Sequence, residues 1–350
     1  MMKKLLKHLF SSLAILTLVS CSKVELRTDV RFSENMVLVG AEKRINDDVS
    51  LKYPFRVRLV DSVLYVMDLH PATHYCHAFA YPSMKHLQSF AKRGAAPGEL
   101  LDAENIRIDR QGHIWVLDAN KKKIVEFTQR GEQIRQEIAL DPALIRTLDI
   151  DLVDESTFVV PDYTGQHRLS FIDRQGRVVK NAFRIPVSEA SSAPKPSVAL
   201  AQAWRSFLHY HPENGILAMV TQLGQVMELY DLKQEKVVRV IRNENTEPQF
   251  VVRGNYAVPT GIMGYSDVHI GRQYIYALFW GHTFDAIKQG NHTEGGRYIH
   301  VFDLHGNPVT QFVLDRHITG FHVDEENGRM VGLDVNGHQP VVEYAFALNE

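Results

Sequence analysis

A six-fold repeat of short β-forming runs constrains the fold of this 350-residue chain more than any single motif. Four of the six runs end in Asp, and the other two end in Thr or Trp. They span residues 63–68 (VLYVMD), 113–118 (HIWVLD), 157–162 (TFVVPD), 216–221 (ILAMVT), 275–280 (IYALFW) and 329–334 (RMVGLD). Successive run ends lie 50, 44, 59, 59 and 54 residues apart. A period of this size is typical of stacked β-units and predicts the blades of a propeller.

Further strands flank every run, so each repeat predicts a small antiparallel sheet. Tight polar turns such as residues 110–112 (RQG) separate several of these strands, as in β-hairpins. A shorter alternating strand precedes each run, at residues 56–61, 105–109, 147–153, 206–211, 267–270 and 320–324. A third strand follows each run, and all units except the last have a fourth. The predicted fold class is all-β, a six-bladed β-propeller, because six matched modules disfavour a β-sandwich with accidental spacing.

The last repeat lacks a fourth strand, because the sequence stops directly after its third. We therefore predict that an N-terminal strand completes the last blade. Residues 24–32 and 36–39 are the candidates, since both are rich in β-formers. Closing the ring in this way removes an exposed sheet edge that would otherwise invite aggregation.

The first twenty residues have the pattern of a signal peptide. Lys3, Lys4 and Lys7 precede an apolar core at residues 9–19, which is too short to span a bilayer. Residues 18–21 (LVSC) resemble the cleavage site of bacterial lipoproteins, which implies that Cys21 carries the lipid. The alternative is an ordinary secretory peptide with an incidental cysteine. The expected organisation is a signal peptide at 1–20, a polar tether at 21–35 and a propeller at 36–350.

Cysteine usage and charge exclude several classes of protein. If Cys21 is acylated, Cys76 has no partner in the chain, so core burial rather than disulfides must stabilise the fold. The formal net charge is −2, and it falls further once the three lysines of the signal peptide are removed. No basic stripe is present, so we expect no nucleic-acid partner. The expected location is the cell envelope, at the outer membrane through the lipid anchor only, on a side that the sequence leaves open.

One repeat resembles a known β-propeller motif. Residues 92–131 contain KRGAAPGEL and then NIRIDRQGHIWVLDANKKKIVEFTQRG, which is similar to an NHL-type repeat. The matching positions are Gly94, Pro97, Gly98, Asp109, Gly112, Trp115, Val116, Asp118, Asn120, Ile124 and Phe127. With the lipoprotein motif, the chain resembles the six-bladed TolB-like propeller lipoproteins of Bacteroides-type bacteria. The resemblance implies the fold and the location but no activity. Thr221 and Trp280 replace the Asp in two repeats, so identical loop residues in all six blades are not expected.

Loop lengths predict which end of the propeller binds a partner. Residues 186–203, 244–263 and 281–297 are long, and all three fall on the face where second strands lead into third strands. Insertions on one face usually mark the binding side of a repeat protein. The candidate ligand-binding residues there are Arg93, Asn120, Asp162, Tyr163, Trp280, His282, Asp285 and Asn336. Trp280 and Tyr163 are expected to stack on a sugar or an apolar side chain, with hydrogen bonds from the Asn and Asp groups.

A simpler role competes with binding for several of these residues. Asp at the end of a strand commonly caps the following turn, and we favour that interpretation for Asp68 and Asp118. For Trp280 and His282 the two interpretations are balanced, because these residues open a long loop.

Metal and catalytic motifs are mostly missing. His70, His74, Cys76 and His77 have suitable ligand types for zinc, but His77 points to the strand face opposite His74 and Cys76. We therefore predict no metal site there. No continuous calcium loop, G-x-S-x-G elbow, phosphate loop or H-E-x-x-H helix is present. Carboxylates from separate blades, such as Asp118, Asp162 and Asp334, leave a calcium site open.

Two functions remain from different classes. The first is a non-catalytic binding or scaffold protein, without a cofactor, for an envelope protein, a peptide or a glycan. The missing catalytic motifs favour this function. The alternative is a metal-assisted hydrolase or lyase, similar to the calcium-dependent lactonases, with a site at the propeller axis.

Overall fold

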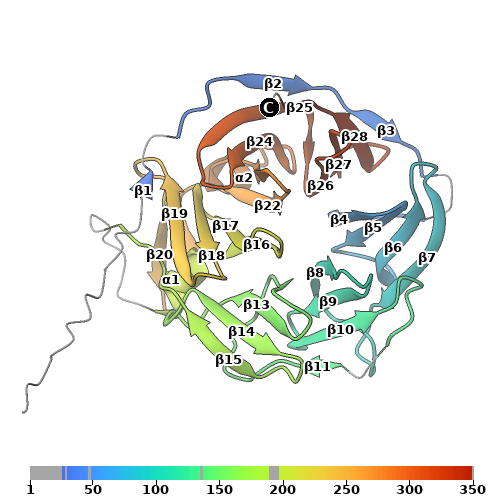
Figure 1. Cartoon of the computed structure of the whole chain (residues 1–350), viewed down its shortest axis with the longest axis horizontal. Coiled ribbons are helices and arrows are strands. Elements are labelled where there is room, and N and C mark those ends of the chain that lie inside the picture. The colour runs from blue at the N-terminus through green and yellow to red at the C-terminus, as the bar shows by residue number, and fades with distance from the viewer. Residues whose placement is uncertain (1–25, 28–29, 46–48, 135–136, 189–196, 349–350) are drawn as a thin grey trace, which may run out of the picture.

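Six sheets of antiparallel strands surround a central axis in the computed structural model, which describes residues 26–27, 30–45, 49–134, 137–188 and 197–348 (Figure 1). Blade 1 contains β4 (Pro54–Val60), β5 (Val63–Asp68), β6 (His74–Ala80) and β7 (Lys85–Lys92), and blade 2 contains β8 (Ala103–Ile108), β9 (Ile114–Asp118), β10 (Lys123–Phe127) and β11 (Ile138–Ala139). Blade 3 contains β12 (Asp151–Leu152), β13 (Thr157–Pro161), β14 (Leu169–Asp173) and β15 (Val178–Ala182), and blade 4 contains β16 (Ser206–His211), β17 (Ile216–Thr221), β18 (Val226–Asp231) and β19 (Lys236–Arg242). Blade 5 contains β22 (Tyr265–Ile270), β23 (Tyr274–Phe279), β24 (Gly296–Asp303) and β25 (Pro308–Ile318), and blade 6 contains β26 (Phe321–Asp324), β27 (Arg329–Leu333) and β28 (Val341–Ala345). The predicted six-bladed propeller is confirmed.

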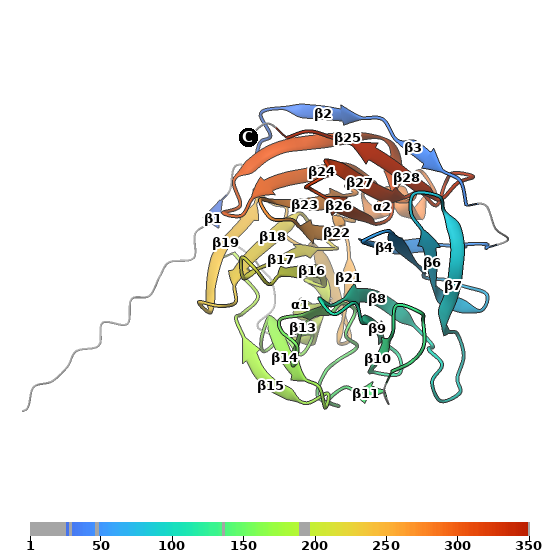
Figure 2. The same ribbon diagram turned by 45° about the vertical axis from the view of Figure 1, so that its right-hand side comes forward.

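An N-terminal strand completes blade 6, as predicted, but it is not one of the two candidates. The closing strand is β3 (Ala41–Lys43), which pairs antiparallel with β28. Instead, β2 (Asn35–Leu38) runs parallel to β25 outside blade 5, and β1 (Leu26–Arg27) runs parallel to β19 outside blade 4 (Figure 2). The choice of residues 24–32 or 36–39 was therefore wrong. Among the described strands, β3 is the one that directly precedes β4 of blade 1 in the chain, and blade 1 lies next to blade 6 in the ring.

Residues predicted as a tether contact the propeller as well. Besides β1, the backbone N–H of Val30 donates to Asn243 Oδ1 over 2.7 Å. Cys21 and the predicted signal peptide lie outside the described residues.

The second strand of each blade is buried on both faces. All five residues of β9 are buried, as are the last five residues of both β5 and β17. Neighbouring blades cover the two faces of each sheet, so these strands need apolar side chains at consecutive positions rather than alternate ones. This packing explains why the six runs stand out in the sequence.

In blades 1 and 2, an Asp at the end of the second strand connects the blade to the segment that precedes it. The carboxylate of Asp118 accepts backbone N–H groups from Leu101, Asn120 and Lys121 at 2.7–3.1 Å. The Asp68 carboxylate makes the equivalent bonds to Lys52, Tyr53 and His70. Both carboxylates are fully buried. The turn-capping interpretation of these two residues is confirmed, and each also holds the segment that enters its own blade.

The described parts of the three long segments lie at one face of the propeller. They contain α1 (Val198–Ala203), the hairpin of β20 (Phe250–Arg253) and β21 (Tyr256–Pro259), and α2 (Phe284–Lys288). The backbone N–H of Met263 donates to the His282 carbonyl, and that of Ser188 to the Glu247 side chain. We call this end the long-segment face and the opposite end, where first strands turn into second strands, the short-turn face. In the described part of the chain, no helix has the length and apolar character to cross a membrane.

Candidate functional site: an axial cavity

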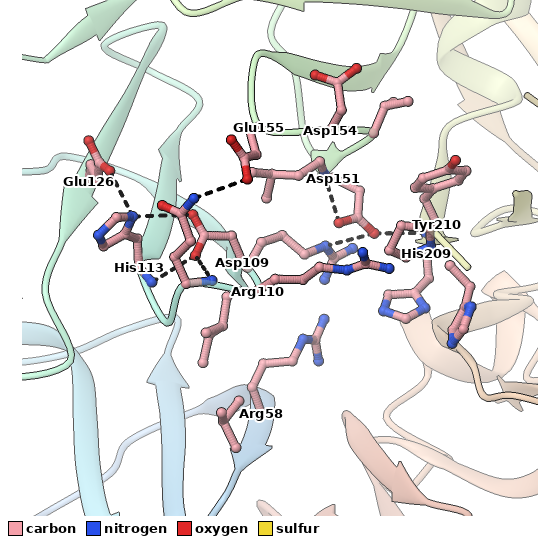
Figure 3. Close-up of a pocket in the computed structure, with 18 of the residues that line it drawn as sticks. Arg58, Asp109, Arg110, His113, Glu126, Asp151, Asp154, Glu155, His209 and Tyr210 are labelled. Atoms are coloured by element: carbon pink, nitrogen blue, oxygen red, sulfur yellow. Dashed lines mark hydrogen bonds and ion pairs between the residues drawn. The ribbon is translucent and has the colours of Figure 1, made fainter. Parts of the chain in front are cut away.

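A cavity of about 650 Å³ lies on the propeller axis and opens on the short-turn face. Its rim includes residues 109–111 and 153–155, which follow the first strands of blades 2 and 3, and residues 210–212 at the end of the first strand of blade 4 (Figure 3). Each first strand contributes a polar side chain to the wall: Arg58 from β4, Arg107 from β8, Asp151 from β12, His209 from β16, His269 from β22 and His322 from β26. All six blades therefore build one site.

The sequence carries a signal for this site that the loop argument missed. The first strands have polar residues at alternate positions, such as Arg56 and Arg58 in β4, and His209 and His211 in β16. Side chains at alternate positions of a strand share one face. Polar alternation in strands that lie next to the axis indicates a polar channel, whereas long loops indicate only where the chain can vary.

Arg107 is paired with two carboxylates and joins three blades. Its Nη2 atom lies 3.1 Å from Asp149 Oδ1 and its Nε atom lies 3.4 Å from Asp151 Oδ2. Nη2 also donates to the Leu208 carbonyl over 2.6 Å. The two carboxylates in turn accept the backbone N–H groups of Leu208 and Tyr210. This network holds the inner ends of blades 2, 3 and 4 together, because every charge in it has a partner.

Arg58 lines the same cavity without such compensation. It is 6% exposed, and its Nη1 atom donates to the Val57 carbonyl over 2.7 Å. Its Nε and Nη2 atoms have no hydrogen-bond partner, and no carboxylate among the described residues lies within 4.0 Å of its guanidinium. Burial, with a further contribution from Arg107, lowers the pKa of Arg58 to about 10. The group is still a cation at neutral pH, and Figure 3 shows its guanidinium pointing into the cavity.

Three imidazoles on the other side of the axis are neutral. The rings of His209 and His269 stack at 4.9 Å, and the ring of His322 lies 4.8 Å from that of His269. Burial lowers the pKa of all three, to about 3 for His322. The Nδ1 atom of His209 accepts the backbone N–H of Ile270 over 2.9 Å, so the neutral ring carries its proton on Nε2.

The described residues contain no group of three or more His, Cys, Asp or Glu side chains that could hold a metal ion. In the motif at residues 70–77, both ring nitrogens of His77 have partners inside the blade, since Nε2 contacts the His74 carbonyl and Nδ1 contacts Ser89 Oγ. Cys76 is fully buried, and burial raises the pKa of its thiol.

Three of the sequence-predicted ligand residues come together on the long-segment face. The rings of Trp280 and His282 are 6.0 Å apart. Trp280 Nε1 donates to the Thr293 carbonyl, and Asn336 Nδ2 donates to the Glu294 carbonyl. These residues therefore hold one loop of blade 5 against blade 6, and their contact with a ligand stays a prediction.

The other five predicted residues are dispersed. Asp162 and Tyr163 are 3% and 4% exposed, so the stacking role predicted for Tyr163 does not fit its burial. Arg93 donates to the Pro71 carbonyl, the backbone N–H of Asn120 donates to Asp118, and the exposed Asp285 pairs with Lys288 in α2. None of the eight predicted residues lines the axial cavity.

Comparison with solved structures supports the fold assignment. An exported protein of Bacteroides fragilis superposes with a TM-score of 0.56 at 9% identity, covering 91% of this chain and 98% of that protein. A member of the DUF4221 family from Bacteroides vulgatus gives a TM-score of 0.55 at 10% identity, covering 90% and 96%. Hydrazine synthase of Kuenenia stuttgartiensis gives 0.51 at 11% identity, covering 87% and 98%. At these identities the similarity concerns the fold alone.

Sequence comparison gives the family directly. No curated protein sequence matches the chain significantly. The sequence profile of one family, described as TolB-like 6-blade propeller-like, matches residues 32–326, which include all or part of every blade. The chain therefore belongs to the TolB-like family of six-bladed propellers.

Proposed function

We propose that this chain is a non-catalytic binding protein of the cell envelope, and that its axial cavity receives part of a peptide or glycan. The observation that supports this function is the cavity itself, which all six blades line. Its volume of about 650 Å³ lies within the range of about 300–1,000 Å³ that is usual for ligand pockets. A peptide end or one or two sugar units would fill it.

The chemistry of the cavity wall supports binding rather than covalent catalysis. The described lining residues include no Ser, Thr or Cys that could act as a nucleophile. Arg107 and Asp151 are used in an ion-pair network that joins blades. Metal analysis of the purified protein separates this function from the alternative of a metal-assisted hydrolase, which requires a stoichiometric divalent ion.

Narrowing the cavity mouth is expected to weaken ligand binding. Gln111 is exposed at the rim, and its side chain reaches across to Glu155 of blade 3. We expect Gln111→Trp to weaken binding at least about tenfold, because the indole would occupy the entrance while the backbone turn stays intact. Calorimetry with a panel of short peptides and oligosaccharides measures the effect.

Gln234→Trp is the matched control, since Gln234 is exposed in a turn of blade 4 on the same face but does not line the cavity. Equal loss of affinity in both variants, or unchanged affinity in Gln111→Trp, would place the binding site elsewhere.

The membrane attachment rests on the sequence motif at residues 18–21. We expect Cys21→Ser to move the protein from the membrane fraction to the soluble fraction, because no other group would carry acyl chains. Fractionation together with mass spectrometry of the mature N-terminus tests this. An unmodified Cys21 in membrane-bound protein would contradict lipid anchoring.

A further inference from the structure

Arg58 offers the edge of its guanidinium that recognises a carboxylate. Nε and Nη2 lie side by side on one edge of the planar group, and these two atoms are the ones without partners. Their two N–H bonds match the spacing of the two oxygens of a carboxylate. The remaining Nη1 atom donates to the Val57 carbonyl. Because Nε and Nη2 have almost no accessible surface, a ligand carboxylate contacts them only after the guanidinium turns further toward the cavity.

We propose that the axial cavity binds a carboxylate group of its ligand through a bidentate contact with Nε and Nη2 of Arg58. This inference rests on the proposed function, because it requires that a ligand enters the cavity. His209 supplies a second donor, since it lines the same cavity with its proton on Nε2.

Packing does not account for Arg58. A buried charge without a partner destabilises a folded protein, so a purely structural site would be better filled by an apolar residue. Arg56 also has free Nε and Nη2 atoms, but it lies over the rings of Phe55 and Phe207 and has Asp267 at 3.9 Å. Arg56 does not line the cavity, whereas Arg58 does. Of these two arginines, Arg58 is therefore the one that faces the cavity.

The charges around the cavity favour a monoanion. The lining contains five basic side chains, Arg58, Arg107, Arg110, Arg174 and Lys233, and five acidic ones, Asp109, Glu126, Asp151, Asp154 and Glu155. A doubly charged phosphate would meet the repulsion of these carboxylates. A carboxylate carries one charge, which Arg58 alone can balance. The free C-terminus of a peptide and the acid group of a uronic sugar both provide this chemistry.

Nuclear magnetic resonance of the ¹⁵N-labelled protein tests the contact directly. The Nε–H signal of Arg58 is identified by its absence in Arg58→Met. We expect sodium acetate to shift this signal saturably, and sodium chloride at equal ionic strength to leave it almost unchanged. Equal shifts with both salts would overturn the assignment to a carboxylate.

Calorimetry with matched probes then distinguishes the two sources of the carboxylate. One pair is a tripeptide with a free or an amidated C-terminus, and the other is galacturonate or galactose. We expect the acid of at least one pair to bind and its neutral partner not to bind. Arg58→Met should weaken that binding about 10- to 100-fold, the range expected for a charge-assisted bidentate contact.

Two further variants define the role of Arg58. Arg58→Lys keeps the charge but loses the two parallel N–H donors of the guanidinium, so binding should stay several-fold weaker than in the wild type. Arg272→Met is the control, because Arg272 is exposed in a turn of blade 5 on the same face and does not line the cavity. It should change affinity less than about threefold.

Thermal unfolding gives a readout that a structural role would move in the opposite direction. Arg58→Met should raise the melting temperature or leave it unchanged, because it removes an uncompensated buried charge. A strong decrease would show that Arg58 supports the fold and would overturn the proposal. Neutral ligands that Gln111→Trp blocks and Arg58→Met does not affect would leave the proposed function standing and refute the carboxylate contact. Acetate binding at Arg58 without any peptide or sugar binding would refute the proposed function instead.

Discussion

Lowering the pH from 7 to 5 is expected to remove about 3–4 kcal/mol of the free energy of unfolding through two buried histidines alone. His77 and His300 are 6% and 3% exposed. Burial lowers the pKa of His77 to about 4 and that of His300 to about 3. His77 has partners for both ring nitrogens, while His300 Nδ1 forms a hydrogen bond with the Tyr265 hydroxyl and the His300 ring stacks on Phe279. Both rings are therefore held in the neutral form by the fold.

The direction follows from proton binding. In the unfolded chain these histidines take up protons near pH 6.5, whereas in the folded protein they stay neutral down to about pH 4. Between these values the unfolded state binds more protons, so stability falls as the pH falls, by up to about 1.4 kcal/mol per pH unit for each ring. The axial histidines act in the same direction but contribute less, because they face a cavity open to water.

One carboxyl group acts in the opposite direction. Burial, together with Asp102, raises the pKa of Glu104 to about 7. The folded state therefore binds the extra proton between about pH 4.5 and 7, and acidification stabilises the protein through this group. Its contribution is reduced by partial exposure of the side chain. The two histidines together outweigh Glu104, so the free energy of unfolding is still expected to fall as the pH falls.

Guanidinium unfolding at pH 7.5, 6.5 and 5.5, followed by tryptophan fluorescence, measures the slope. His300→Gln should reduce the slope of the unfolding free energy against pH by the equivalent of about one proton, whatever its effect on stability at neutral pH. Glu104→Gln should increase this slope. Stability that stays constant between pH 7.5 and 5.5 would contradict the buried neutral histidines.

Breaking the buried ion pair between blades 3 and 4 is expected to cost about 3–5 kcal/mol. Arg168 precedes β14 and Glu228 lies in β18, and both side chains are 0% exposed. Arg168 Nε and Nη2 donate to the two carboxylate oxygens at 2.9 and 2.5 Å. The remaining groups are satisfied as well, since Arg168 also donates to the Trp204 carbonyl and Tyr230 donates to Glu228. Burial lowers the pKa of Arg168, but Glu228 outweighs this effect and the net shift is upward.

Arg168→Met leaves the Glu228 carboxylate buried without its cation, so the large cost arises from the charge left behind. The double variant Arg168→Met/Glu228→Leu removes both charges and should recover much of the loss. Lys180→Met is the control, because Lys180 and Glu235 form an exposed pair across the same two blades. It should cost less than about 1 kcal/mol. Urea unfolding of all four proteins provides the comparison, and similar costs for Arg168→Met and Lys180→Met would contradict the argument.

The architecture could be predicted from the sequence because one physical requirement repeats six times. A second strand covered on both faces needs consecutive apolar residues, as at residues 63–68 and 113–118, and the following turn needs a cap such as Asp68 or Asp118. These requirements are local, so they appear as local patterns. The missing strand of the last repeat likewise implied closure by the N-terminal segment, although the register of that segment was not predictable.

The candidate site could not be predicted in the same way, because it depends on contacts between side chains of different blades. Arg58 and Arg107 occupy equivalent alternating positions in β4 and β8, yet Asp149 and Asp151 from blade 3 lie beside Arg107 and no carboxylate lies against Arg58. Tyr163 was predicted to stack on a sugar or an apolar side chain of a ligand, and its ring is buried. The alternation of side chains along one strand determines which of them face the axis, and the sequence by itself determined this. Which of those charges is neutralised depends on the neighbouring blades, which lie dozens of residues away, and only the tertiary structure decided it.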